Sequence, residues 1–468
     1  MLFNSEAYLF FLPVTVGIYW ILPIRLRVPF LLVASYVFYA SWNAPFLLLI
    51  LGLTVANYAI SRVERRAHPG LWLVSAVGVN LVALGIFKYL GFLDSTANQV
   101  AAALGLPAAL PAVHLVLPLG ISFFAFEFIH YQVDLHRGNP PIDSPVRFAL
   151  FPAFFPTQIA GPIKRYEQFD AQVLRGPRFQ PEMFVGGLEL IALGLLKKVA
   201  LADRLSPIAN QVFGHSAKVT SLDAAVGLLA FSLQIYFDFS GYTDIGRGSA
   251  QLLGFRVPIN FSAPYLATSF QDFWRRWHMS LSSWLRDYVY IPLGGSRQGT
   301  RRNALNLLAT MALGGLWHGA AWHFVFWGTA HGTGLAGQRL SRGRLQLALP
   351  PKARLLLGWL GTQVAVVALW GFFRAGSVGQ GAVMLGRVVT GARHLGVASR
   401  SDALRVVLVA AGLLAVQLAA RQSWLREPGA KLRRVPAVRA AALGSALALG
   451  IFFATAVGTP QPFIYFQF

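Results

Sequence analysis

Long apolar blocks, and not short amphipathic periods, dominate the hydrophobic pattern of the chain. Most of these blocks approach or reach the roughly 20 residues that a helix needs to cross a lipid bilayer. The clearest are Ala7–Leu22, Pro45–Ile60, Leu71–Leu93, Phe184–Leu196, Leu222–Tyr236, Leu355–Phe373, Val406–Ala420 and Ala440–Val457. With the shorter or more polar blocks included, we expect an all-α polytopic membrane protein with roughly ten to twelve transmembrane or re-entrant helices.

Composition agrees with a membrane protein, because 55% of the 468 residues are hydrophobic and only 12% are charged. The formal net charge of +22 would suggest a nucleic-acid partner in a soluble protein. Here Lys and Arg cluster in short connections between apolar blocks, which is typical of cytoplasmic loops. We therefore expect lipid and not nucleic acid around the chain, with its N-terminus outside. The absence of cysteine excludes a Cys nucleophile and thiolate metal sites.

No soluble domain is visible, so residues 1–468 are expected to form one membrane domain. No internal repeat stands out either, which disfavours a transporter built from duplicated halves. Between about Val146 and Trp327, Pro, Gly, Asp, Arg, His and Trp interrupt the apolar runs. Polar or irregular backbone at membrane depth is tolerated only where protein buries it or a wet cavity adjoins it. The functional core is therefore expected at about residues 146–335, with re-entrant segments or a solvated chamber.

The segment Phe270–Tyr288 is predicted to form one amphipathic helix at the membrane interface. Its aromatic and leucine residues recur at helical spacing and form an apolar stripe. On the other side, Arg275 and Arg286 would face lipid headgroups or an anionic ligand. His278 lies at the edge of the stripe and could point into the protein.

One histidine, His318, lies among small and aromatic residues in the run Gly-Gly-Leu-Trp-His-Gly-Ala-Ala-Trp (314–322). An ionisable residue at membrane depth is a functional-site hypothesis by default. A neutral imidazole in a dry pocket can take a proton from a hydroxyl and later release it. From these residues alone, a structural histidine bonded between helices is an equally good interpretation. His323 and His331 are interpreted as helix-packing or pore-lining groups, and no histidine or carboxylate cluster suggests a metal.

Family resemblance changes this balance. Trp317-His318-Gly319 is preceded by the Arg-Trp-His segment Phe273–Ser280 and by the run Trp284–Gly295. Together they resemble the signature of the membrane-bound O-acyltransferases, and the last run resembles the bacterial alginate O-acetyltransferase branch. Further similar motifs are Met1–Ser5, Gln158–Ile163, Gln234–Asp244 and Phe463–Phe468. The resemblance spans nearly the whole chain.

The resemblance implies a helical shell around a central tunnel that joins a cytoplasmic donor site to an outward acceptor site. It implies that His318 is catalytic and that His278 is a second site residue, with a structural role for His278 equally open. The expected donor is acetyl-CoA, with no permanently bound cofactor or metal. The expected acceptor is an extracytoplasmic polysaccharide such as alginate, reached directly or through a periplasmic acetyltransferase or relay protein. The expected location is the bacterial inner membrane.

Four further residues are candidates for substrate binding: Trp317, Arg275, Arg276 and Asp238. Guanidinium groups bind phosphate in bidentate fashion, so the two arginines could hold a nucleotide-bearing donor, although headgroup contact is the simpler interpretation. Asp238 could line the chamber or pair with a nearby Arg. Two other functions stay open: a transporter that exports an acyl carrier or a lipid-linked sugar without forming a bond, and a scaffold for a soluble acetyltransferase.

Overall fold

The computed structural model of the chain describes residues 1–63, 69–107, 115–159, 161–341, 349–420, 444 and 463–464. Across these residues the secondary structure is helical throughout, with no strand. The all-α prediction is therefore confirmed. The block Ala440–Val457 lies outside the described residues apart from Gly444.

Five helical stretches among the described residues are long and apolar enough to cross a membrane: Pro45–Arg62, Pro69–Ala103, Ser221–Leu252, Pro351–Arg374 and Arg400–Ala419. In four of them no more than 28% of the most apolar window is buried, which leaves large apolar faces. Such faces are suited to contact with lipid. The helix Ser221–Leu252 differs, because 78% of its window is buried by protein.

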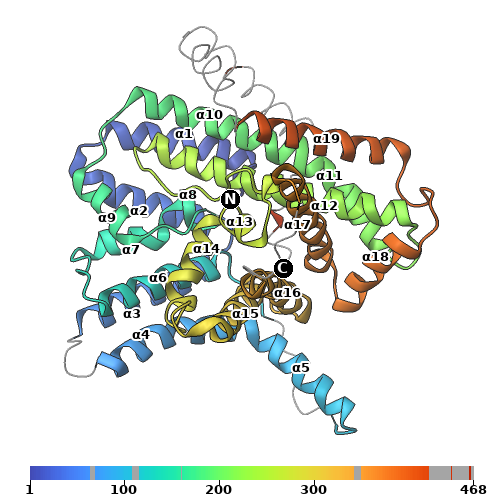
Figure 1. Cartoon of the computed structure of the whole chain (residues 1–468). Helices are drawn as coiled ribbons and strands as arrows, with labels where there is room; N and C mark the ends of the chain where they lie inside the picture. Colours follow the sequence, from blue (N-terminus) through green and yellow to red (C-terminus); the bar gives the residue numbers. More distant parts are fainter. Residues whose placement is uncertain are drawn as a thin grey trace. The chain divides into compact units, whose positions relative to one another are not determined.

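Contacts divide the chain into two compact units, of which the first comprises Met1–Ile191 and Ile245–Pro258. Its helices, coloured blue to teal in Figure 1, are α1 (Glu6–Ile21), α2 (Ile24–Ala40), α3 (Pro45–Arg62), α4 (Pro69–Leu84), α5 (Leu90–Ala103), α6 (Ile121–His136), α7 (Pro145–Ala153), α8 (Phe155–Gln158) and α9 (Tyr166–Arg175). A π-helical turn, η1 (Gly85–Tyr89), joins α4 to α5. Most of α10 (Pro181–Leu195) and the last residues of α12 (Ser221–Leu252) complete this unit.

A buried ion pair stabilises the interior of the first unit. The Lys164 ammonium lies 2.9 Å from both carboxylate oxygens of Glu127, and both side chains are almost fully buried. The motif Gln158–Ile163 immediately precedes this lysine. Gly120 has φ +73°, and a Cβ there would lie 2.7 Å from the carbonyl oxygen of Gln158. Glycine therefore permits both the turn before α6 and the close approach of the two backbones.

The second unit comprises Ala192–Asp244 and Ile259–Phe468. Its α-helices are α11 (Asp203–Gly214), most of α12, α13 (Phe270–Trp274), α14 (Met279–Leu285), α15 (Gly299–His318), α16 (Trp322–Leu340), α17 (Pro351–Arg374), α18 (Val378–Thr390) and α19 (Arg400–Ala419). Shorter elements are the π-helical η2 (Leu196–Ala202) and η4 (Arg286–Tyr290) and the 3₁₀ turn η3 (Pro264–Leu266). Ser399 and Asp402 cap the start of α19 as a reciprocal capping box.

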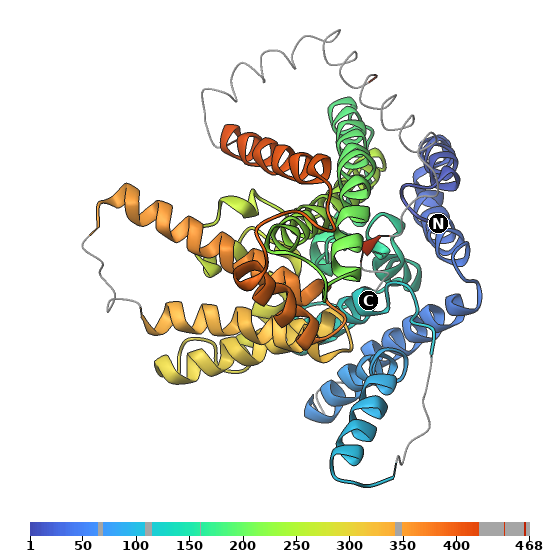
Figure 2. The ribbon, with the colours of Figure 1, turned by 90° about the vertical axis from the view of Figure 1, so that its right-hand side faces the viewer.

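Helices α15 and α16 form an antiparallel hairpin, and both views show them side by side (Figure 1 and Figure 2). Their backbones approach closely because glycines face each other: a Cβ on Gly315 would lie 2.2 Å from the Phe324 carbonyl oxygen, and one on Gly328 would lie 2.2 Å from that of Met311. Small residues at a helix–helix interface allow the two backbones to come into direct contact, which is common between membrane helices. The hairpin therefore holds the end of α15 firmly against the start of α16.

The prediction of one continuous helix over Phe270–Tyr288 is wrong. The structure divides the segment into α13, a turn, α14 and η4, and the break falls at His278, where φ is +42°. An L-residue in the left-handed region cannot continue a right-handed helix. The amphipathic spacing was nevertheless informative, because Phe273, Trp274 and Trp277 are all buried.

Candidate active site

His318 is the last residue of α15. The helix ends there because Gly319 adopts an extended conformation, and the Gly319 N–H donates back to the Gly315 carbonyl. A Cβ on Gly319 would lie 2.1 Å from the ring of Phe324, so only glycine fits. The imidazole is placed by the helix terminus and is only 4% exposed.

Aromatic rings enclose His318. The centroid of its ring lies 5.0 Å from that of Trp317, 5.2 Å from that of Trp327 and 5.4 Å from that of Phe373. All three contacts are edge-on, which is a favoured geometry for aromatic pairs. Such a dry surrounding strengthens any electrostatic interaction that the imidazole makes.

The structure places His278 beside His318. The two ring centroids are 6.3 Å apart, and His278 also lies 6.0 Å from Trp317 and 4.6 Å from Phe239. This spacing is too long for a direct hydrogen bond between the rings. It is suited to one reacting group held between two imidazoles.

His278 is fully buried in the turn between α13 and α14, outside the five candidate spans. Burial lowers the pKa of its imidazole, so this ring is neutral at neutral pH. Neither ring nitrogen has a hydrogen-bond partner in the part of the chain that the structure describes. Asn260 fixes the turn, because its carbonyl accepts from the Met279 N–H at 2.9 Å and its side-chain oxygen accepts from the Ser280 hydroxyl at 2.6 Å. A strained backbone held this firmly is frequent at functional sites.

The two arginine candidates lie on the outer side of the same turn. Arg275 is exposed. Arg276 makes two hydrogen bonds: its Nε donates to the Asp272 carboxylate at 2.7 Å, and one of its terminal nitrogens donates to the Ser262 carbonyl at 3.3 Å. The charge of Arg276 is thus balanced by Asp272 of α13. Of the predicted substrate-binding residues, Trp317 therefore lies against His278 and His318, whereas Arg275 and Arg276 lie in more exposed positions.

Asp238 lies in a buried charge network. Lys198 bridges two carboxylates, with 2.9 Å to Asp238 and 2.8 Å to Asp203. The second Asp238 oxygen accepts the backbone N–H of Ile464 at 2.7 Å. The partner of Asp238 is therefore a lysine and not the arginine considered from sequence. Phe463, next to Ile464, stacks on Tyr242 with 4.4 Å between ring centroids.

Sequence reasoning missed the parts played by Trp327 and Phe373 around His318 and by Lys198 beside Asp238. A signal for Trp327 existed, because His323, Trp327 and His331 recur at every fourth position and therefore share a face of α16. No local signal pointed to Phe373 or Lys198, since each reaches its partner from a distant helix. Among the described residues no group of three His, Asp or Glu side chains is arranged to hold a metal ion.

Replacing Gly315 with alanine is expected to damage both stability and activity. The added Cβ meets the Phe324 carbonyl at 2.2 Å and Gly328 at 3.1 Å, so α15 and α16 must separate and shift His318. Overpacking of this kind typically costs about 1–3 kcal/mol. Thermal unfolding in detergent and acyl-transfer rate would both report it. The matched control is Gly337→Ala on α16, where nothing lies within 4 Å of the added Cβ. Equal melting temperatures and rates for the two variants would contradict the proposed packing.

Comparison with known proteins identifies the family of the chain. The family model of the membrane-bound O-acyltransferase family matches residues 141–369. The chain is 43% identical to the probable alginate O-acetylase AlgI of Azotobacter vinelandii over 80% of the chain and 75% of that relative. It is 43% identical to the probable alginate O-acetylase AlgI of Pseudomonas aeruginosa, over 80% of the chain and 72% of the relative.

A third relative is named for another polymer. The chain is 34% identical to the peptidoglycan O-acetyltransferase of Helicobacter pylori, over 80% of the chain and 77% of that relative. Each of these three matches covers 80% of the chain and more than two thirds of the relative. The chain therefore belongs to the membrane-bound O-acyltransferase family and is an O-acyltransferase.

Proposed function

We propose that this enzyme moves an acetyl group from a cytoplasmic thioester donor, acetyl-CoA, toward hydroxyl groups of an extracytoplasmic polysaccharide. The observation that carries the proposal is the pair of buried imidazoles, His278 and His318, with 6.3 Å between their centroids inside an aromatic enclosure. Acyl transfer from a thioester needs a base for the attacking hydroxyl, support for the developing oxyanion, and positioning. Two imidazoles on either side of one reacting group supply these needs.

In the proposed reaction, His318 takes the proton of the acceptor hydroxyl while its oxygen attacks the thioester carbonyl carbon. The tetrahedral intermediate collapses, the carbon–sulfur bond breaks, and the sulfur leaves as a thiolate. The imidazolium then returns its proton to that thiolate. The products are an acetyl ester and a free thiol, so no oxidant or metal is consumed. His278 orients the reacting group between the two rings.

The names of the relatives support acetyl as the acyl group and a cell-envelope polysaccharide as the acceptor. Two of the relatives described above are named as acetylases of alginate and one as an acetyltransferase of peptidoglycan. The acceptor proposed here is therefore an extracytoplasmic glycan, with alginate as the first to test. The same reasoning proposes the bacterial inner membrane as the location, and a periplasmic acetyltransferase or relay protein as the partner that completes delivery.

Acetyl transfer is tested with the purified full chain in lipid vesicles, supplied with labelled acetyl-CoA on the side of the basic loops. We expect free CoA to appear together with labelled ester on alginate oligosaccharide or on an added periplasmic partner. Label that crosses the membrane still attached to its carrier would overturn the proposal in favour of a transporter. Transfer that occurs only when a soluble acetyltransferase is added, and that does not change on substitution of His318, would make this chain a scaffold.

A further inference from the structure

Three segments of the first unit that are far apart in the sequence pack into one basic surface. They are the α1–α2 connection (20–27), the end of α9 with the residues after it (172–179), and the end of α12 with the residues after it (252–256). Two side chains hold the first segment to the other two. A terminal nitrogen of Arg27 donates to the Pro177 carbonyl at 3.1 Å, and the Trp20 indole donates to the Leu252 carbonyl at 2.9 Å.

The second and third segments are joined by a reciprocal pair of hydrogen bonds. The Arg256 N–H donates to the side-chain oxygen of Gln172 at 2.7 Å, and the side-chain nitrogen of Gln172 donates to the Arg256 carbonyl at 3.0 Å. The Arg27 guanidinium lies over the Trp20 ring, 4.9 Å from its centroid. A cation in that position is attracted to the ring. Arg27 therefore serves to hold the three segments together.

Four other arginines of this surface are exposed: Arg25, Arg175, Arg178 and Arg256. None of these four side chains forms an ion pair within the described ranges. The three segments contain no Asp or Glu, and Asp170, just before the second segment, is held by Arg147 at 2.9 Å. The four guanidinium groups are therefore available to an anionic partner.

Large apolar side chains alternate with these arginines along the chain. Five of them are 51% to 84% exposed: Ile21, Ile24, Leu26, Leu174 and Phe179. The segments that carry them adjoin helix ends, since α1 ends at Ile21 and α10 begins at Pro181. Arginines beside exposed apolar side chains at helix ends are typical of the boundary between lipid headgroups and acyl chains.

We propose that this surface, made of segments 20–27, 172–179 and 252–256, binds an anionic phospholipid of the cytoplasmic leaflet. The exposed guanidinium groups hold the headgroup phosphate, and the apolar side chains contact the acyl chains. Basic residues at the ends of membrane helices mark the cytoplasmic side, where anionic lipids give the membrane a negative surface potential. Lipid is favoured over an acidic protein because charged and apolar side chains are interleaved at the helix ends. The inference does not depend on the acetyl transfer proposed above.

The full chain, purified in neutral detergent, is titrated with dioleoyl phosphatidylglycerol or dioleoyl phosphatidylcholine, and the first bound lipid is measured by native mass spectrometry. The natural chain is expected to prefer phosphatidylglycerol. Two double variants each remove two exposed arginines: Arg175→Gln with Arg178→Gln, and Arg25→Gln with Arg256→Gln. Each arginine near a membrane surface contributes about fivefold, equivalent to ~1 kcal/mol, so each double variant is expected to weaken phosphatidylglycerol binding roughly 25-fold. Binding of phosphatidylcholine and the melting temperature stay as in the natural chain, because all four side chains are exposed.

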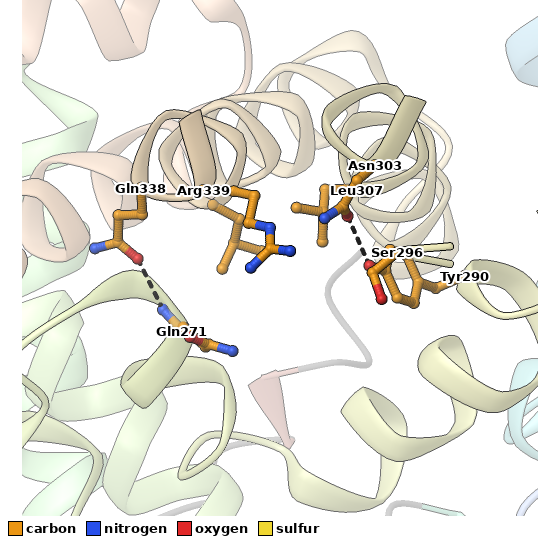
Figure 3. Close-up of a pocket in the computed structure, with 8 residues that line it drawn as sticks. Gln271, Tyr290, Ser296, Asn303, Leu307, Gln338 and Arg339 are labelled. Carbon is orange, nitrogen blue, oxygen red and sulfur yellow. Dashed lines mark hydrogen bonds between the residues drawn. The ribbon is translucent and has the colours of Figure 1, made fainter. Parts of the chain in front are cut away.

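The matched control, Arg302→Gln with Arg339→Gln, removes the same charge from two segments of the second unit. Arg302 is exposed in the first turn of α15. Arg339 lies in a polar pocket of about 270 Å³ beside Gln338 and Asn303 (Figure 3). The control is expected to bind phosphatidylglycerol as the natural chain does. Equal weakening in the control and in the two double variants would show a general charge effect and overturn the proposed site.

Other results also overturn the inference. Equal binding of the two lipids by the natural chain removes the selectivity for an anionic headgroup. Weakening confined to one double variant shows that the three segments do not form one site. Displacement of the lipid by an equal concentration of glycerol phosphate assigns the surface to a free phosphate. If the double variants bind phosphatidylglycerol normally but lose binding of acyl carrier protein, an acidic protein, the surface docks a protein instead.

Discussion

His318→Gln is expected to reduce acetyl transfer by about 10²–10⁴-fold, the usual contribution of a general base. Glutamine has a similar polarity and length but cannot take up a proton at neutral pH. The imidazole has three edge-on aromatic neighbours, so a residue of similar size keeps the enclosure filled. The measurement is the initial rate of labelled ester formation from acetyl-CoA. Because the substitution acts on the reaction and not on donor binding, kcat falls while KM for the donor changes little.

The control for His318→Gln is His394→Gln in the same unit, because His394 is exposed. Both variants are expected to keep the melting temperature of the natural chain within a few degrees. Transfer by His318→Gln at the rate of the control would exclude His318 as the base. A large loss of melting temperature confined to His318→Gln would show a structural role in its place.

Lys198→Met is expected to destabilise the protein by about 3–5 kcal/mol, the cost of removing one partner from a buried ion pair. The Lys198 side chain is 1% exposed and bridges Asp238 and Asp203, so its loss leaves two carboxylates without their cation. The adjacent Ile464 N–H also depends on Asp238, so the contact at the C-terminal end loosens too. Thermal unfolding in detergent measures the effect, together with the transfer rate.

Lys197→Met is the matched control, because Lys197 precedes Lys198 and pairs with Asp244 through side chains that are 18% and 11% exposed. This second pair is less buried than the Lys198 network, so its removal is expected to cost less. The triple variant Lys198→Met, Asp203→Asn and Asp238→Asn is expected to recover part of the lost stability, since no uncompensated charge remains. A melting temperature for Lys198→Met that matches the control would refute the network as a source of stability.

The helical segments could be predicted closely because they depend on local pattern. Pro45–Ile60 was expected and α3 covers Pro45–Arg62, while Leu355–Phe373 was expected and α17 covers Pro351–Arg374. Apolar length alone determines such helices in a membrane, since the backbone must satisfy its own hydrogen bonds there. The same rule was insufficient for Phe270–Tyr288. The helical spacing of its apolar residues correctly marked which side chains are buried. However, hydrogen bonds to Asn260 hold a left-handed turn at His278, and no residue next to His278 in the sequence signals that turn.

By itself, the sequence determined the membrane class, the family and the candidacy of His318, because apolar length and ordered motifs are properties of the chain in one dimension. Only the tertiary structure decided that His278 lies beside His318 and that Lys198 and not an arginine pairs with Asp238. Each of these depends on helices that are distant in sequence and are brought together by packing. His318 is therefore visible as a motif, whereas the aromatic enclosure around it exists only in the folded protein.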